Sequence, residues 1–233
     1  MPPYLTRFTP VIYPSMPAIT WLTLFGYDPF ILALFLVLPQ VLAPSELLDQ
    51  VSRKYGRLDS FSADFEQISQ DSSNQPVVHR GHVYLKSGRR ALFEYSEPQR
   101  KSEYFQGKTY TVYYPPPVGQ AHQFPMNQAD SDLLAIIQVV GNRETPWKNH
   151  FSEFRDSPGR QGNSRVLDLK PKNKDLTGVE IEVDPSTFFI DRMVIKTADG
   201  QRNEYKFTNI KTAPLADLLF KFVAAPGVEV IKQ

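Results

Sequence analysis

The 233-residue chain contains no cysteine. This absence excludes disulfides, thiolate zinc sites, cysteine nucleophiles and lipid attachment through a cysteine thiol. The chain also lacks an excess of charge of either sign, because 26 Lys and Arg residues against 25 Asp and Glu residues give a net charge of +1. Proteins that bind nucleic acid normally carry a strongly basic face, so we expect no nucleic-acid partner.

Catalytic motifs are missing as well. The sequence has no G-x-S-x-G turn, no H-E-x-x-H helix and no glycine-rich phosphate loop, which are the motifs that hold a nucleophile, a zinc ion and a phosphate group. His79 and His82 share one predicted strand, but no third ligand stands at a matching spacing, so we expect surface histidines and no metal site. The sequence therefore predicts a protein that is not an enzyme and has no cofactor.

Long apolar runs are scarce too, and the longest, Phe30–Leu38, has nine residues. That length is too short for a bilayer core of about 30 Å, but it fits the hydrophobic region of a secretory signal. Val41 and Ala43 stand at the −3 and −1 positions that signal peptidase reads. We predict a signal peptide over residues 1–43, cleaved after Ala43, and a single domain over residues 44–233 outside the cytoplasm.

Two alternatives to this leader stay open. Arg7 is the only basic residue before the apolar run, and a start at Met16 would leave the α-amine as the only positive charge there. The other alternative is a retained membrane anchor, although Asp28, Pro29 and Pro39 interrupt the span. Mapping the mature N-terminus would distinguish a free domain from a tethered one.

The stretch from Arg80 to Pro117 has the strongest secondary-structure signal. Its period of two, broken by turn residues, predicts four short strands: His82–Lys86, Ala91–Ser96, Lys101–Gln106 and Thr109–Tyr114. These strands carry more large apolar and aromatic side chains than so short a meander can bury by itself. Another layer of the protein or a ligand must therefore cover that face.

The rest of the chain predicts two helices and further strands around this meander. Ser45–Leu58 is an amphipathic helix, whereas Asp132–Val140, stopped by Gly141 and Asn142, is apolar on nearly all sides and must be covered on nearly all sides. Val118–Gln128 is predicted as a loop, and Trp147–Phe154 is left open between helix and strand. The remaining predicted elements are strands Ser60–Ile68, Val166–Lys170, Gly178–Val183, Ile190–Thr197, Arg202–Ile210 and Phe220–Val223, with a helical turn over Pro214–Leu219.

These elements predict an α+β fold. About ten antiparallel strands curl strongly, because each pair adds roughly 20° of twist, and a curled sheet with helices across its mouth encloses a concave apolar space. We therefore expect a strongly curved sheet, an incomplete β-barrel, with lid helices over an apolar cavity.

Five blocks of the sequence, in order, resemble the LolA family of periplasmic lipoprotein carriers. They are Leu58–Gln67, Gly81–Lys86, Leu92–Tyr95, Gly107–Pro115 and Phe220–Val228. The resemblance implies a periplasmic, monomeric carrier whose cavity takes the acyl chains of lipoproteins. It would receive them from an inner-membrane ABC transporter and pass them to the outer membrane, with an outer-membrane receptor as a further candidate partner. The alternative is a membrane-tethered lipid-binding or stress-sensing β-domain of similar fold.

The resemblance also implies a set of site residues. The aromatic excess of the meander and the lid implied by the family place the cavity lining at Phe61, Phe65, Val83, Leu85, Phe93, Tyr95, Val112, Leu133 and Ile137. For any one of these residues, ordinary core packing is the alternative. The family's lid-bonding arginine corresponds to Arg89 or Arg90, in a turn that is longer than the family's and lacks its proline; a solvated hairpin tip is the alternative.

Overall fold

The computed structural model describes residues 43–70, 75–87, 90–140, 147–159 and 162–233. Residues 1–42 of the predicted signal peptide, the predicted stop of the second helix at Gly141 and Asn142, and Arg89 lie outside the described residues. Among the described residues, no helix is long and apolar enough to cross a membrane.

The described residues form one curved sheet of twelve strands. The strand order is β12-β6-β5-β4-β3-β2-β1-β11-β10-β9-β8-β7, and all neighbours are antiparallel except β12 and β6. The sheet does not close, since β12 and β7 remain at its edges. The strands are β1 Ser60–Gln70, β2 Pro76–Lys86, β3 Arg90–Glu97, β4 Lys101–Gln106, β5 Thr109–Tyr114, β6 Gln120–Pro125, β7 Phe151–Pro158, β8 Arg165–Pro171, β9 Leu176–Val183, β10 Ile190–Thr197, β11 Arg202–Lys211 and β12 Glu229–Lys232.

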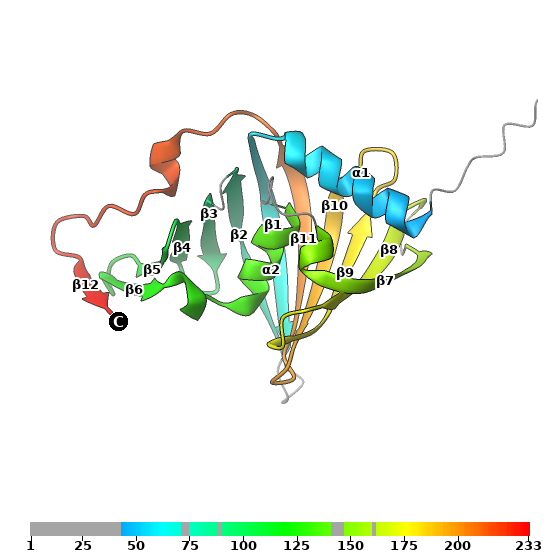
Figure 1. The fold of residues 1–233 in the computed structure, drawn as a ribbon. Helices are drawn as coiled ribbons and strands as arrows, with labels where there is room; N and C mark the ends of the chain where they lie inside the picture. Colours follow the sequence, from blue (N-terminus) through cyan, green and yellow to red (C-terminus); the bar gives the residue numbers. More distant parts are fainter. Residues whose placement is uncertain (1–42, 71–74, 88–89, 141–146, 160–161) are drawn as a thin grey trace, which may run out of the picture. The chain divides into compact units, whose positions relative to one another are not determined.

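Two α-helices cross one face of this sheet (Figure 1). Helix α1, Pro44–Arg57, has Glu46 in its first turn and Lys54 in its last. Charges of these signs at these ends interact favourably with the helix dipole and stabilise the helix. Helix α2, Ser131–Val140, follows β6 and the 3₁₀ helix η1, Met126–Gln128. The predicted fold, an open curved sheet with helices on its apolar face, is confirmed.

Two of the predicted elements are wrong. The segment Val118–Gln128 is not a loop but contains β6. Polar side chains interrupt the alternation of apolar and polar residues in β6, so the sequence does not show the strand. Its pairing with β5 places Phe124 opposite Tyr110. The segment Phe220–Val223 is not a strand, because Phe220 ends the 3₁₀ helix η3, Asp217–Phe220. The closing strand is β12, which pairs in parallel with β6.

The open interpretation of Trp147–Phe154 is now resolved. The 3₁₀ helix η2, Trp147–Asn149, is followed directly by β7, and Phe151 is buried where the strand begins. Nine of the ten predicted strands are present, and β6, β7 and β12 bring the number among the described residues to twelve.

The segment after β11 runs past the ends of the neighbouring strands toward β12 (Figure 1). Phe220 is fully buried, and the ring of Phe222 lies 5.5 Å from that of Tyr104 and 5.4 Å from that of Tyr113, measured between centroids. Since Tyr104 alternates with the inward-facing Phe105 along β4, these contacts are on the face opposite to α1 and α2.

Candidate functional site

All nine residues predicted to line the cavity lie in one apolar cluster on the concave face of the sheet. Val112 is partly buried and packs against this cluster. The other eight are at least nine-tenths buried: Phe61, Phe65, Val83, Leu85, Phe93, Tyr95, Leu133 and Ile137. The structure thus brings the predicted residues together, and their role in binding lipid stays a prediction.

Phe65 is at the centre of the aromatic part of this cluster. Its ring centroid lies 6.0 Å from that of Phe93, 5.1 Å from that of Tyr95 and 6.4 Å from that of Tyr205. The first two pairs meet edge to face, the geometry that aromatic quadrupoles favour. Gly81 makes room for the ring, because a Cβ atom on Gly81 would stand 2.8 Å from Phe65 Cζ and 2.1 Å from the Glu94 carbonyl oxygen.

Helix α1 covers one part of the concave face. Leu47, Leu48 and Val51 are almost fully buried beneath it. The hydroxyl oxygen of Tyr55 accepts a hydrogen bond from the Ile190 backbone N–H at 3.0 Å, which fixes the last turns of α1 to β10. Burial raises the pKa of the Tyr55 hydroxyl well above its usual value, so it stays neutral.

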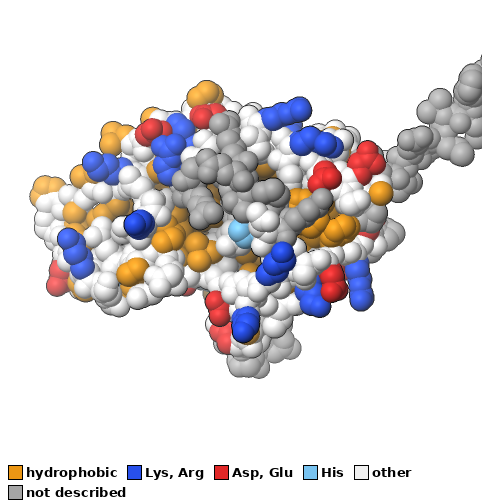
Figure 2. All heavy atoms as spheres, in the orientation of Figure 1, with side chains coloured by type: hydrophobic (Ala, Val, Ile, Leu, Met, Phe, Trp, Pro, Cys, Tyr) orange, Lys and Arg blue, Asp and Glu red, His pale blue; other side chains and the backbone are white. Residues whose placement is uncertain are grey.

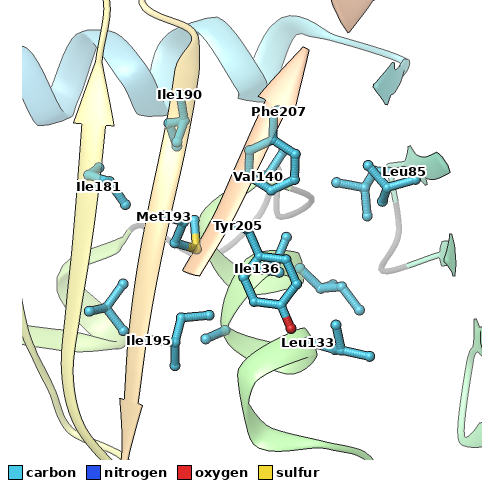
Figure 3. Packing of buried hydrophobic residues seen from close by; sticks show 14 of the residues in the cluster. Leu85, Leu133, Ile136, Val140, Ile181, Ile190, Met193, Ile195, Tyr205 and Phe207 are labelled. Atoms are coloured by element: carbon cyan, nitrogen blue, oxygen red, sulfur yellow. The ribbon is translucent and has the colours of Figure 1, made fainter. Parts of the chain in front are cut away.

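Helix α2 covers the neighbouring part of the face. Figure 3 shows Leu133, Ile136 and Val140 of α2 directed toward Tyr205 and Phe207 of β11. The N-terminal end of α2 is tied to the same strand, because the Asp132 carboxylate accepts hydrogen bonds from the Tyr205 hydroxyl and, at 3.1 Å, from Asn203 Nδ2. Burial raises the pKa of both Asp132 and Tyr205.

The concave face is filled in this structure. The apolar side chains of α1 and α2 occupy the space above the sheet, and the hollow left between Tyr55, Phe61 and Leu85 has a volume of only about 10 Å³. A hollow of about 920 Å³, lined by polar groups such as Asp64 and Lys206, opens elsewhere on the described part. Figure 2 shows apolar side chains across the face that carries the helices, with charged groups around them. Among the described residues, side chains therefore fill the space predicted for the cavity.

The concave face becomes polar toward one end. Glu103 of β4 is 1% exposed; its Oε2 accepts a hydrogen bond from the Tyr110 hydroxyl at 2.7 Å, and its Oε1 lies 2.5 Å from Lys101 Nζ. Lys101 Nζ is also 4.3 Å above the ring of Tyr95. Burial raises the pKa of the Glu103 carboxyl, while the lysine and the tyrosine oppose that rise.

Arg90 is the one of the two predicted latch residues that the structure describes. Its Nη1 lies 2.8 Å from Asp217 Oδ1 in η3, and Lys86 Nζ lies 2.7 Å from the same oxygen. These two cations lower the pKa of the Asp217 carboxyl, with the Lys86 hydrogen bond as the larger cause. The end of β2 and the start of β3 thus hold η3 in this structure, and an arginine latch on α2 stays a prediction.

Several residues of the site were not predicted from the sequence. Phe105, Tyr110, Tyr205 and Phe207 are buried in the same cluster as the predicted residues. The alternation of Tyr205 and Phe207 with charged residues in a predicted strand is a signal that could have found them. The contact of Asp132 with Tyr205 could not be found in this way, since 73 residues separate the two.

The fold defines an α+β domain with one open curved sheet and two helices packed on its apolar face. The family described as "Outer membrane lipoprotein carrier protein LolA" matches residues 56–223. The chain therefore belongs to the LolA family of outer membrane lipoprotein carriers, a family named for carriage rather than catalysis.

Similar proteins agree with this assignment. The outer-membrane lipoprotein carrier protein of Vibrio vulnificus is 28% identical over 187 residues, which cover 79% of this chain and 89% of that protein. The protein of the same name from Actinobacillus succinogenes is 27% identical over 191 residues, covering 80% and 88%. Among solved structures, an uncharacterized conserved protein of Thermus thermophilus has a TM-score of 0.52 at 12% identity, with 81% of this chain and 98% of that chain covered, and so shares the fold.

Proposed function

We propose that this protein is a periplasmic chaperone that binds the acyl chains of lipoproteins on its concave face and carries them from the inner to the outer membrane. The observation that carries the proposal is the continuous apolar cluster, which spans the concave face from Phe61 to Val112 and is covered by two helices. Membership of a family of lipoprotein carriers supports the same function.

The energetics explain why such a carrier is needed. Exposing an acyl chain to water costs about 0.8 kcal/mol per methylene, so a lipoprotein with several chains does not cross an aqueous compartment unaided. A carrier must shield the acyl chains from water as the membrane does, but it must not bind them so tightly that it cannot release them. In the closed state the apolar faces of α1 and α2 fill the site, so loading exchanges one set of apolar contacts for another. The free-energy difference between empty and loaded states then stays small, and both are accessible.

Opening must move at least one of the helices. Helix α1 is held by Leu47, Leu48 and the Tyr55 hydrogen bond, and α2 by its apolar side and the Asp132 carboxylate. In the proposed cycle a cargo-bearing ABC transporter of the inner membrane supplies the acyl chains as the helices open, and Arg89 or Arg90 serves as a latch on the cover. The outer membrane, or a receptor in it, takes the chains from the monomeric carrier.

The proposal can be tested with residues 44–233 and a matched pair of variants. Val112→Lys places a charge at the predicted cavity wall, at a position of β5 that is only partly buried. Val78→Lys makes the same change at an exposed position of β2. We expect the wild type and Val78→Lys to co-purify with tri-acylated lipoproteins, and Val112→Lys to lose them while keeping its circular dichroism spectrum. A wild-type protein that recovers neither lipoprotein nor lipid from the periplasm would contradict the proposal.

A further inference from the structure

A hollow of about 470 Å³ opens at the N-terminal end of α2. Its walls come from the end of β1, the start of α2, the β8–β9 and β10–β11 turns and the beginning of β11. The residues that line it are Gln67, Ser69, Asp130, Ser131, Asp132, Asp175, Thr197, Ala198, Asp199, Gln201 and Asn203.

The lining of this hollow is acidic. It includes four aspartates and no lysine, arginine or histidine among its described residues. Hydrogen bonds from Thr197 and Gln201 lower the pKa of Asp199, so this carboxylate stays ionised at neutral pH. Arg202 is adjacent in the chain but turns to Glu204, with its Nη2 2.6 Å from Glu204 Oε2. Arg202 therefore does not neutralise the carboxylates at the hollow. Lys101 interacts electrostatically with Asp130, and four carboxylates beside this one lysine attract a cation. Figure 2 shows acidic side chains together with a Lys or Arg side chain on the lower protrusion of the molecule.

A second and independent observation concerns Gln67. The residue is 8% exposed, its Nε2 donates a hydrogen bond to Ser69 Oγ at 3.0 Å, and its Oε1 is buried without a partner. Whichever way the amide is turned, Ser69 satisfies only one of its two polar atoms. A buried polar atom without a partner is unfavourable, and because Gln67 Oε1 is an acceptor, the group that completes it is an N–H or O–H donor.

The position of the hollow relates it to the apolar face. Inward-facing residues along β1 change from Phe61 and Phe65 to Gln67, and those along β11 change from Phe207 and Tyr205 to Asn203. Figure 3 shows the Tyr205 hydroxyl pointing toward this end, beside Leu133. An amphiphile that lies under α2 with its polar end toward Gln67 and Asn203 would therefore meet the hollow.

We infer that this hollow binds a positively charged, N–H-rich peptide segment, the part of the cargo polypeptide that directly follows its acylated residue. The inference rests on the proposed function, because the acyl chains bring the peptide to this end of the concave face. Gln67 and the carboxylates receive N–H groups and a basic side chain. Asp132 lines the hollow and also accepts the hydrogen bond that holds α2 to β11. A bound peptide and the docked helix therefore contact the same carboxylate.

The test compares two synthetic tri-acylated lipopeptides that differ only in four lysines or four glutamates after the first two residues. Binding to residues 44–233 is measured by calorimetry at low salt and at 0.15 M salt. We expect the lysine form to bind about tenfold more tightly at low salt, where charges interact over about 30 Å, and the preference to shrink at 0.15 M. Asp130→Asn with Asp175→Asn, both at exposed positions, should remove most of the preference, whereas Asp168→Asn on an exposed site of β8 should not.

The outcomes separate this inference from the proposed function. Equal affinity for the two lipopeptides, both bound tightly, would overturn the peptide site and leave the carrier function intact. If neither lipopeptide binds, the carrier function fails, and the unacylated lysine peptide then tests the hollow alone. Binding of that peptide that is lost with Asp130→Asn and Asp175→Asn would support the site, and no binding would overturn it. Gln67→Met, which removes the unpaired atom at similar volume, should keep the melting temperature and lower the affinity for the lysine lipopeptide.

Discussion

Replacing Tyr205 by phenylalanine should loosen the N-terminal end of α2 without disturbing the sheet. The Tyr205 ring is fully buried against Phe65 and Phe207, and the substitution keeps these contacts. It removes only the hydroxyl that donates to Asp132, a buried carboxylate that then keeps Asn203 and the Leu133 N–H. A hydrogen bond to a charged group contributes about 1.5–3 kcal/mol, and 1.4 kcal/mol is a factor of ten. We expect α2 to open about 10- to 100-fold more often.

Amide hydrogen exchange measured by mass spectrometry checks this expectation. In Tyr205→Phe the amides of α2 should exchange at least tenfold faster than in the wild type, while those of β1 and β11 keep their protection. Tyr104→Phe, which removes a hydroxyl on the outer face, is the matched control and should leave α2 unchanged. Unchanged exchange in α2, or equal acceleration in α2 and β11, would refute the idea that Asp132 holds the helix.

The same contact makes the cover sensitive to pH. Burial, together with the neighbouring Asp130, raises the pKa of Asp132 in the docked helix. Protonated Asp132 stabilises the docked helix when its pKa is higher in the docked state than in the undocked state. This stabilisation is fully present below the undocked pKa, near 3.8, and is lost as the pH rises through the pKa of the docked state. After correction for intrinsic rates, α2 should therefore exchange more slowly as the pH falls from 7 toward 4. Asp132→Asn should abolish this dependence, and a dependence that survives in Asp132→Asn would point to another group.

Two further predictions concern the sheet itself. Gly81→Ala should lower the free energy of unfolding by about 1–3 kcal/mol, because the new Cβ would meet Phe65 at 2.8 Å; Gly178→Ala is the control, since its Cβ would have 3.9 Å of room. Urea titrations measure both, and equal stability of the two variants would count against the packing. The Arg192 hydrogen bond lowers the pKa of Glu204 to about 2, so its contribution to stability is present above pH 4.5 and is lost as the pH falls toward 2. Acid titration of Glu204→Gln should show a smaller loss over that range than the wild type, and an unchanged loss would contradict the pairing.

The sequence predicted the meander well because each of its strands is defined locally. Strands β2 to β5 alternate apolar and polar side chains and are separated by turn residues, so period and punctuation agree. Helix α1 was predicted for a similar reason, since its spacing of three and four leaves one apolar face. The number of strands and their twist predicted the curvature, and the resemblance to a carrier family predicted the second helix as a lid. The curved, unclosed sheet with helices on its apolar face is confirmed.

The wrong elements depend on contacts between distant parts of the chain. Strand β6 has few apolar side chains and forms because β5 on one side and β12 on the other supply hydrogen-bonding partners. Phe220 and Phe222 alternate like residues of a strand, but their rings pack against the outer face through a 3₁₀ helix and the segment after it.

The candidate site divides in the same way. The lining positions could be predicted, because apolar and polar side chains alternate along β3 and place Phe93 and Tyr95 together on its apolar face. The tie between Asp132 and Tyr205 could not, because it depends on where α2 lies against a strand that follows it much later in the chain. That the site would be filled by its own helices also depends on the tertiary arrangement alone.

The most direct test of the central claim asks whether acyl chains contact the concave face. A photo-crosslinking p-benzoylphenylalanine in place of Phe93 would stand on the inner side of β3, and one in place of Tyr104 on the outer side of β4. Cells that express each variant are irradiated, and the crosslinked products are identified by mass spectrometry. The account predicts crosslinks to the acyl chains of lipoproteins from position 93 and none from position 104. Folded protein without acyl crosslinks at position 93, or with equal crosslinks from both positions, would contradict it.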